Sequence, residues 1–379
     1  MMDFELDEKR TSVVVDLAAL SHNLRELKKN LPESAKLAAV VKANAYGHGA
    51  VEVSRTAVES GADLLCFATV GEAREVIQAG EKAPMLVMGA PMSDSLTDIV
   101  DYGIRQCVFL PLHVLALQKI AEEKNTEALV HVKIDTGMNR LGVKTEAEFE
   151  ALLATLIRCD RVTFEGMFTH FAVSDETDKA FSRAQAELFE RFYQMALEKG
   201  FSPIRHACNS GAIIDMPEYA YDFVRAGIAM YGCYPSNEVF KERVNLKPVM
   251  SIYSHIAHIK TVLTGESISY GRTFIAEESM RVATVPIGYG DGFNRLLSNR
   301  GEMLVHGKRA RILGRVCMDM TMIDVTDIDE AKIGDVVTVM GEDGGERISA
   351  DDMADICGTI SYEILLSFTP RLPRVYIHG

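Results

Sequence analysis

A lysine at the end of a short apolar run is the first residue of this 379-residue sequence that could do covalent chemistry. Lys42 follows the run of residues 37–41. An amine at the end of a buried strand is partly desolvated, which lowers its pKa and prepares it to attack a carbonyl carbon. A lysine that simply extends from a strand end into water fits the same position. The next loop contains Gly47 and Gly49, which favours close approach of a bound ligand.

Polar side chains stand at or just beyond the ends of several later apolar runs. They are Lys133, Asp135, Arg140, His170, Asn209, Ser210 and Arg225. A buried arginine must meet an acceptor, so Arg225 is expected to bind either a protein carboxylate or a ligand atom. Arg140 has the same two interpretations, with a substrate carboxylate as its ligand.

Two of these positions could bind a phosphate group. Ser210 precedes a short helical pattern, and Gly227 and Ile228 follow the last apolar run, so both loops offer hydrogen-bond donors at a helix start. Ordinary helix N-capping by Ser210 is the alternative. His131, His255 and His258 show no metal-ligand spacing, and Cys317 has no neighbouring base in the sequence. We therefore expect structural histidines, a cysteine that lines a pocket, and no metal site.

The elements that must position these residues alternate between apolar runs and amphipathic stretches. Helical patterns cover residues 146–157 and 179–197. Eight apolar runs can be counted, at residues 36–41, 63–68, 85–88, 105–109, 129–134, 162–169, 204–207 and 222–225. Eight strand–helix units over about 200 residues predict an α/β fold with a (β/α)₈ barrel, whose catalytic face lies at the carboxyl ends of the strands. The competing doubly wound sheet usually carries a GxGxxG turn, which is missing after the first run.

The sequence pattern changes after about residue 245. Strand-like segments follow one another there, at residues 251–262, 281–286, 309–313, 322–324 and 336–340. We therefore predict a barrel domain over residues 1–245 and a mostly β domain over residues 246–379. The strand-like segment 12–16 is expected to pack with the β domain.

Composition limits the possible partners and the compartment. The chain has 40 Lys+Arg against 54 Asp+Glu, a net charge of −14, which disfavours nucleic acids and anionic membranes as partners. No apolar run approaches the roughly 18 residues of a membrane span. Seven scattered cysteines indicate reduced thiols, and we expect a cytoplasmic location.

Five separated motifs carry a resemblance to a known family. They are residues 39–49, 133–142, 224–232, 269–272 and 314–319. The sequence resembles bacterial alanine racemases, which are fold-type III enzymes dependent on pyridoxal 5′-phosphate, and the likeness runs from about residue 13 to 377. Asn139 stands where many members have glycine. The resemblance implies interconversion of L- and D-alanine by two bases, which supplies D-alanine for peptidoglycan.

The resemblance also implies a role for individual residues. Lys42 carries the cofactor and is one base, and Tyr270 is the opposite base, which reaches the site from the partner of a head-to-tail homodimer. Arg225 faces the pyridine nitrogen, and His170 links it to the tyrosine. Tyr46, Ser210, Gly227, Ile228 and Tyr362 hold the phosphate, with Asn209 beside them. Arg140 and Met318 bind the substrate carboxylate, and Lys133 matches a lysine that is carbamylated in some members. Tyr289, Arg295, Arg315 and Ile360 line a narrow entrance that favours small amino acids, and we expect alanine to be preferred to serine.

Two other functions remain open from the sequence. A decarboxylase on the same barrel would use an acidic partner at the pyridine nitrogen, where this chain has Arg225. A non-catalytic carrier of the cofactor shares the barrel and the lysine but generally lacks a β domain such as residues 246–379 and a residue like Tyr270.

Overall fold

The structure, a computed structural model, describes residues 10–378 and divides into two compact units. The barrel unit comprises residues 19–45 and 49–247, and the β unit comprises residues 10–18, 46–48 and 248–378 of the described chain. Residues 1–9, the start of the predicted barrel domain, and residue 379 lie outside the described residues. The chain thus passes from the barrel unit into the β unit and back at residues 46–48, just after Lys42.

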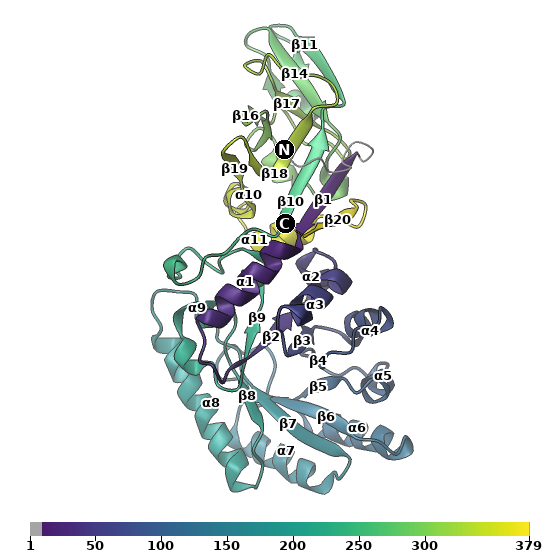
Figure 1. Cartoon of the computed structure of the whole chain (residues 1–379), viewed down its shortest axis with the longest axis vertical. Coiled ribbons are helices and arrows are strands. Elements are labelled where there is room, and N and C mark those ends of the chain that lie inside the picture. Colours follow the sequence, from purple (N-terminus) through teal and green to yellow (C-terminus); the bar gives the residue numbers. More distant parts are fainter. Residues whose placement is uncertain (1–9, 379) are drawn as a thin grey trace. The chain divides into compact units, whose positions relative to one another are not determined.

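Eight parallel strands close the barrel, which confirms the predicted fold class (Figure 1). They are β2 (Lys36–Val40), β3 (Leu64–Phe67), β4 (Met85–Val87), β5 (Arg105–Val108), β6 (Ala128–Lys133), β7 (Val162–Phe168), β8 (Ile204–His206) and β9 (Phe223–Ala226). Strands such as β2 and β3 are buried on both faces, as their continuous apolar runs require when helices cover a parallel sheet.

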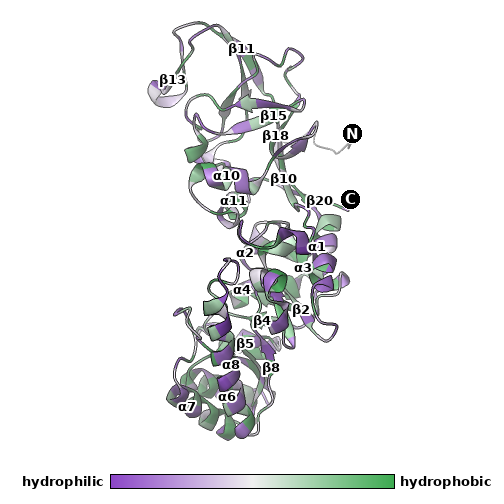
Figure 2. Ribbon diagram, turned by 90° about the vertical axis from the view of Figure 1, so that its left-hand side faces the viewer, coloured by the Kyte–Doolittle hydropathy of each residue, from purple (hydrophilic) through white to green (hydrophobic). Residues whose placement is uncertain are grey.

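Helices alternate with these strands along the chain. They are α1 (Leu17–Lys29), α2 (Lys42–Tyr46), α3 (Ala50–Glu59), α4 (Val70–Gln78), α5 (Leu96–Asp101), α6 (Pro111–Glu123), α7 (Glu146–Arg158), α8 (Ala180–Glu198) and α9 (Ser210–Asp215), with short 3₁₀ turns η1 (Pro217–Tyr219), η2 (Ile228–Tyr231) and η3 (Lys241–Arg243). Figure 2 shows hydrophobic and hydrophilic residues interleaved along α6 and α7, as amphipathic packing requires. Thr69 with Glu72 and Thr145 with Glu148 form capping boxes that begin α4 and α7.

One barrel strand contains a β-bulge. Val130 of β6 is paired with Phe164 of β7, but the next residue, His131, is paired with Gly166, so Glu165 is an extra residue in β7. A Cβ atom on Gly166 would lie 2.5 Å from the His131 ring, so only glycine fits there. The bulge therefore changes which side chain of β7 faces β6.

The β unit contains a seven-stranded sheet with the order β16-β15-β18-β10-β1-β20 and β19 beside β18, a three-stranded sheet β11-β14-β17, and the pair β12-β13. Its strands are β1 (Thr11–Asp16), β10 (Met250–His255), β11 (His258–Val262), β12 (Ser267–Ile268), β13 (Phe274–Ile275), β14 (Met280–Val285), β15 (Glu302–Val305), β16 (Lys308–Arg311), β17 (Thr321–Asp324), β18 (Val336–Asp343), β19 (Glu346–Ile348) and β20 (Arg374–Ile377). Helices α10 (Ala350–Cys357) and α11 (Ser361–Ser367) and turns η4 (Tyr270–Arg272), η5 (Tyr289–Asp291) and η6 (Arg295–Leu297) complete it. β1 pairs with β10 and β20.

The segment 251–262, read as one strand from the sequence, is two strands in different sheets. The N–H of Ile256 donates to Asp335 at 2.9 Å, and the N–H of Ala257 donates to Thr284 at 2.9 Å. The chain therefore changes sheets between these two residues. The two strands also differ in burial, because β10 alternates between buried and half-buried residues whereas most of β11 is exposed.

Candidate active site

Lys42 lies two residues after the end of β2 and begins a left-handed turn. The three residues after it have φ values of 52° to 53°. Such a conformation costs about 1–2 kcal/mol for each residue that has a Cβ atom. Two hydrogen bonds offset part of that cost: the N–H of Ala45 donates to Val41 at 2.9 Å, and the N–H of Ala43 donates to the Glu72 carboxylate at 2.7 Å. The turn holds the backbone beyond Lys42 in one direction.

The environment of Lys42 favours its neutral amine. The side chain is half-buried, and loss of water lowers its pKa. The positive charges of Arg140 and, more weakly, Arg225 lower this pKa further, whereas the nearby Glu72 carboxylate acts in the opposite direction. The structure thus brings three of the predicted site residues within electrostatic range of one another.

Arg225 is buried at the carboxyl end of β9 and uses most of its donors within the protein. Its Nη1 donates to Nδ1 and to the carbonyl oxygen of His206, both at 2.9 Å. Its Nη2 donates to the carbonyl oxygens of Thr169 at 2.7 Å and Ala207 at 3.0 Å, and it lies 3.3 Å from Nδ1 of His170. The protein carboxylate that the sequence left open as a partner is absent from these acceptors. Within residues 10–378, Nε–H is the guanidinium donor that has no acceptor.

Burial changes the acid–base properties of this part of the barrel. It lowers the pKa of Arg225 to about 10. Burial, followed by the charge of Arg225, lowers the pKa of His170 well below its usual range, so this imidazole is neutral near pH 7. The link from the arginine to His170 that the family resemblance implies has a physical basis here, because the neutral Nδ1 can accept from the guanidinium.

Lys133, the last residue of β6, is a buried amine. Its Nζ donates to the carbonyl oxygen of Ile134 at 3.0 Å and lies 5.2 Å from the centroid of the Phe168 ring. Burial, with a further contribution from the charge of Arg225, lowers the pKa of Lys133 to about 7. A large fraction of this amine is therefore uncharged and nucleophilic near neutral pH.

The loop after β6 is organised around one carboxylate. Asp135 accepts from the N–H groups of Gly137 at 2.9 Å, Asn139 at 3.0 Å and Arg140 at 3.0 Å. Partial burial alone would raise the pKa of Asp135, but these bonds outweigh it and lower the pKa. Asn139 has a φ of 53°, a left-handed conformation that asparagine tolerates almost as well as glycine. The loop thus presents the exposed Arg140 side chain from a rigid backbone.

The loops after β8 and β9 are joined by a serine hydroxyl. Oγ of the buried Ser210 accepts from the N–H groups of Gly227 at 3.0 Å and Ala229 at 3.2 Å, and Ile228 lies between these two residues. Asn209 is the N-cap of α9, since its Oδ1 accepts from the N–H of Ala212 at 3.1 Å. The N-capping interpretation of Ser210 is therefore wrong, and no hydrogen bond within the described residues uses its hydroxyl hydrogen.

Two predicted phosphate residues lie side by side in the β unit. The rings of Tyr46 and Tyr362 have centroids 6.1 Å apart. The loop that carries Tyr46 is packed closely against α11, because a Cβ atom on Gly47 would lie 2.7 Å from the Leu365 carbonyl oxygen. Arg374 donates to the Gly47 carbonyl at 3.0 Å. The segment next to the Lys42 turn is thereby attached to α11.

Tyr270 lies on a strained, exposed turn of the β unit. Its side chain is 68% exposed, and Ser269 before it and Gly271 after it have φ values of 66° and 71°. Oγ of Ser269 donates to the carbonyl oxygen of Arg315 at 2.5 Å, and a Cβ atom on Gly271 would lie 2.9 Å from the Arg315 guanidinium carbon. These contacts hold the tyrosine turn against the 314–319 motif.

Met318 and the predicted entrance residues lie on loops of the same unit, whereas Arg140 belongs to the barrel unit. The carbonyl oxygen of Met318 accepts from Gly290 at 2.8 Å, and the N–H of Tyr289 donates to Cys317 at 3.0 Å. Sγ of Cys317 lies 3.4 Å from Oγ of Ser269, which places this thiol in the wall of the loop cluster. Other exposed members of the predicted entrance are Arg295 on η6 and Ile360 at the N-cap of α11.

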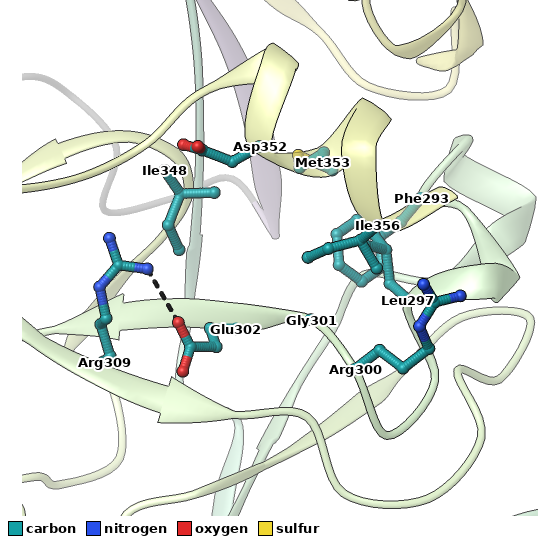
Figure 3. Close-up of a pocket in the computed structure, with 10 residues that line it drawn as sticks. All are labelled: Phe293, Leu297, Arg300, Gly301, Glu302, Arg309, Ile348, Asp352, Met353 and Ile356. Atoms are coloured by element: carbon teal, nitrogen blue, oxygen red, sulfur yellow. Dashed lines mark hydrogen bonds and ion pairs between the residues drawn. The ribbon is translucent and has the colours of Figure 1, made fainter. Parts of the chain in front are cut away.

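A pocket of the β unit lies apart from these predicted residues (Figure 3). Apolar side chains such as Phe293, Met353 and Ile356 line it, and Arg309 beside them pairs with Glu302 at 2.8 Å. None of the predicted catalytic, cofactor or substrate residues lines this pocket. Over residues 10–378 no cluster of three or more metal-ligating side chains occurs, and no described helix is long and apolar enough to cross a membrane.

The residues that surround the arginine and the lysine were not predicted as site residues, although His131 was expected to be a structural histidine. Glu72 serves both as the capping-box residue of α4 and as an acceptor for the Lys42 turn, and His206 is the main side-chain acceptor of Arg225. His131, Glu165 and Arg105 extend the contacts of His206. One feature of the sequence could have indicated these residues. Within the apolar run 162–169, Glu165 stands beside Gly166.

The fold and the residues at the barrel mouth define an enzyme built on a (β/α)₈ barrel followed by a β unit. The family model described as the N-terminal domain of alanine racemase matches residues 15–235, and that of the C-terminal domain matches residues 249–376. The chain belongs to the alanine racemase family.

Relatives cover nearly the whole chain. Alanine racemase 2 of Caldanaerobacter subterraneus subsp. tengcongensis is 44% identical over 375 residues, which is 98% of this chain and 96% of the relative. The solved alanine racemase of Clostridium difficile 630 has a TM-score of 0.93 at 37% identity and covers 98% of this chain and 96% of its own. A histidine racemase of Leuconostoc mesenteroides has a TM-score of 0.90 at 26% identity, covering 98% of both chains.

Proposed function

We propose that this enzyme interconverts L- and D-alanine with pyridoxal 5′-phosphate as its cofactor and thereby supplies D-alanine for peptidoglycan. Membership of the alanine racemase family supports the reaction class. The observation that carries the proposal is the buried Arg225, which bonds to no carboxylate in the described chain and keeps its Nε–H free for a ring nitrogen. A decarboxylase of this fold would instead place an acidic group at that nitrogen.

The donor set of the barrel mouth fits the cofactor. Lys42 offers an amine with a lowered pKa to bind an aldehyde carbon. Ser210, with the backbone at Gly227 and Ile228, offers donors for a phosphate, and we keep Asn209 in this group as a residue that fixes the loop. We also assign Tyr46 and Tyr362 of the β unit to the phosphate, as the family resemblance implies. Bound pyridoxal phosphate withdraws electrons from the α-carbon of an amino acid and so acidifies its Cα–H bond.

The chain's own residues would then move the proton and hold the substrate. We assign Lys42 and Tyr270 as bases on opposite faces of the α-carbon, since removal on one face and return on the other inverts the configuration. Arg140 would bind the substrate carboxylate through its guanidinium, and Met318 through its backbone. An arginine at the ring nitrogen does not give up its proton readily, so charge stays near the α-carbon and proton return to that carbon is favoured.

Lys133 would assist Arg140. Its amine, with a pKa of about 7, is the group we propose to be carbamylated: its nitrogen attacks the carbon of CO₂, an N–C bond forms and a proton is released. The resulting negative charge would orient the arginine. All seven cysteines are free, which supports a reducing compartment, and we place the enzyme in the cytoplasm.

One experiment separates the three candidate functions. The purified protein is incubated with pyridoxal phosphate and L-alanine in deuterated water and followed by proton NMR and chiral chromatography. Formation of D-alanine with deuterium at the α-carbon is the expected result. Released CO₂ would favour the decarboxylase, and cofactor binding without turnover would favour the carrier.

We further propose that alanine is preferred to serine, because Tyr289, Arg295, Arg315 and Ile360 are assigned to a narrow entrance. The measurement is kcat/KM for the two amino acids, with histidine as a bulky third. A larger kcat/KM for serine or histidine than for alanine would contradict the assignment.

A further inference from the structure

A chain of hydrogen bonds runs from Arg225 through two buried histidines on barrel strands to a partly buried carboxylate. Nη1 of Arg225 lies 2.9 Å from Nδ1 of His206, whose Nε2 lies 2.8 Å from Nδ1 of His131. Nε2 of His131 lies 3.0 Å from Oε2 of Glu165, which also pairs with Arg105. Both imidazoles are completely buried or nearly so. The five side chains come from five strands, β9, β8, β6, β7 and β5.

The chemistry at its two ends fixes the direction of the chain. A guanidinium has no acceptor, so Nδ1 of His206 must be the acceptor and its proton must lie on Nε2. That proton points at Nδ1 of His131, which leaves the proton of His131 on its own Nε2, directed at Glu165. Every N–H group therefore points from Arg225 toward Glu165. Reversal of either imidazole would place two N–H donors face to face.

Glu165 ends the chain as an ionised acceptor. Arg105 donates to both of its oxygens, at 2.7 Å and 2.9 Å. Partial burial alone would raise the pKa of Glu165, but bonds from His131 and Arg105, with the charge of Arg105, lower it to about 2. The carboxylate reaches His131 only because β7 has its bulge there and because Gly166 leaves room for the imidazole.

The hydrogen-bonded side chains from Arg225 to Glu165 are not suited to conduct a proton. Transfer from Arg225, with a pKa of about 10, to Glu165, with a pKa of about 2, would be disfavoured by roughly 10⁸-fold. Burial lowers the pKa of both histidines, with Arg225 a further cause at His206. Groups that face them include Glu165, Arg105 and Lys133, and the imidazoles are neutral near pH 7. Neutral imidazoles of one orientation can hold a neighbour in place without exchanging charge with it.

We propose that Glu165 is a positioning residue for the reaction: it sets the tautomers of His131 and His206 and thereby keeps an acceptor in front of the Arg225 guanidinium. The ring of His206 is itself stacked on Phe168, at 4.7 Å between centroids and 5° between planes, so it cannot turn away. With its Nη groups held, the guanidinium directs Nε–H in a fixed direction. The role of that N–H at a ring nitrogen rests on the proposed function. The direction of the hydrogen bonds from Arg225 to Glu165 does not rest on it.

The first test reads the tautomers in the wild-type protein. Nitrogen-15 NMR of histidine-labelled protein, as purified, reports which ring nitrogen carries the proton. We expect His131 and His206 to be neutral, protonated at Nε2, and unchanged between pH 6 and 8. Their signals are assigned with single His→Gln variants. A proton on Nδ1 of either residue, or a doubly protonated imidazole at pH 7, would overturn the proposal.

The second test removes the charge that ends the chain. In Glu165→Gln, one orientation of the amide places its NH₂ group against Nε2 of His131 and the other places it against Nη2 of Arg105. Only the second orientation still accepts from His131, so the glutamine no longer holds a single tautomer. We expect averaged Nδ1 and Nε2 signals for at least one histidine, and a kcat lowered tenfold or more with KM within twofold. Glu165→Asp, which keeps a carboxylate, should restore much of both properties.

Glu190→Gln is the matched control, because Glu190 pairs with Arg205 at 3.1 Å on the same barrel but outside the chain. It should leave the histidine signals and kcat unchanged. A Glu165→Gln protein with native histidine signals and native kcat would refute the positioning role. Absence of any deuterium exchange in the wild type would refute the proposed function instead and leave the tautomer result standing.

Discussion

At the residue scale, the barrel mouth concentrates cationic side chains, and the charges of Arg140 and Arg225 lower the pKa values of Lys42 and Lys133. Lys42, Lys133, Arg140 and Arg225 all contribute to this local field, against the nearby carboxylates Asp135 and Glu72. Burying such groups lowers the stability of the folded chain, because their charged forms lose water. The arrangement fits the proposed site for a phosphate and a carboxylate beside two amines of lowered pKa.

The loss of stability caused by burying a charged amine can be measured at Lys133. Its pKa is about 7 in the folded chain and 10.5 as an ordinary lysine, so between these values the unfolded chain binds the additional proton. Stability therefore rises with pH across this window, by on the order of 1.4 kcal/mol for each pKa unit. We expect Lys133→Met to be more stable than the wild type at pH 6, with the difference shrinking toward pH 9.5.

The measurement is thermal unfolding in CO₂-free buffer at both pH values. Lys199→Met, which replaces an exposed lysine at the end of α8, is the control and should alter stability equally at the two pH values. If Lys133→Met shows the same difference from the wild type at pH 6 and pH 9.5, the lowered pKa is wrong.

At the element scale, an alanine-to-glycine substitution in the left-handed turn after β2 should change stability in the direction opposite to that expected from helix propensity. Ala43 is exposed and has a φ of 53°, so its Cβ atom strains the folded state by about 1–2 kcal/mol. Glycine removes that strain and costs about 0.5–1 kcal/mol in chain entropy. Ala43→Gly should therefore raise the free energy of unfolding by roughly 0.5–1 kcal/mol, as measured in urea.

Ala154→Gly is its matched control. Ala154 is an exposed residue within the right-handed helix α7, where glycine lowers stability by about 0.8–1 kcal/mol. The two substitutions are chemically identical and should have opposite signs. Two losses of similar size would show that the turn is not left-handed in solution.

The β7 bulge is the other element on which the site depends. Without the additional residue at Glu165, the register of β7 against β6 would continue unchanged and a different side chain would face His131. The run 162–169 predicted a strand, and the strand is present. The residue propensities of this run did not predict its bulge. The reason is that the roles of Glu165 and Gly166 depend on His131, which lies opposite them on β6.

At the scale of the whole molecule, the net charge and the site have opposite signs. The chain carries −14 overall, yet the described barrel mouth is cationic. The net charge disfavours large polyanionic partners such as nucleic acids. The proposed binding of one phosphate and one carboxylate depends instead on the charged groups close to the site.

The proposed head-to-tail dimer makes a prediction at the same scale. Lys42 belongs to the barrel unit and the exposed Tyr270 to the β unit. If each site takes Lys42 from one subunit and Tyr270 from its partner, a mixed dimer of Lys42→Ala and Tyr270→Phe has one intact site. An equal mixture that exchanges subunits should then recover about one quarter of wild-type activity.

Each variant alone, exchanged with itself, is the control and should remain inactive. Subunit exchange is verified with two affinity tags. No recovery despite verified exchange would place both bases in one subunit and contradict the shared site.

The sequence by itself determined the eight barrel strands, the mostly β C-terminal region and the family, because apolar periodicity and motif order are local properties of the chain. It also singled out Lys42 and Arg225, since a charged residue at the end of an apolar run is conspicuous. The partners of these residues came only from the tertiary structure. His206, His131 and Glu165 are 19, 94 and 60 positions from Arg225 in the sequence, and only closure of the barrel brings their strands into one hydrogen-bonded chain. Which imidazole nitrogen bears a proton depends on that closure, because an acceptor is assigned only by the donor that faces it.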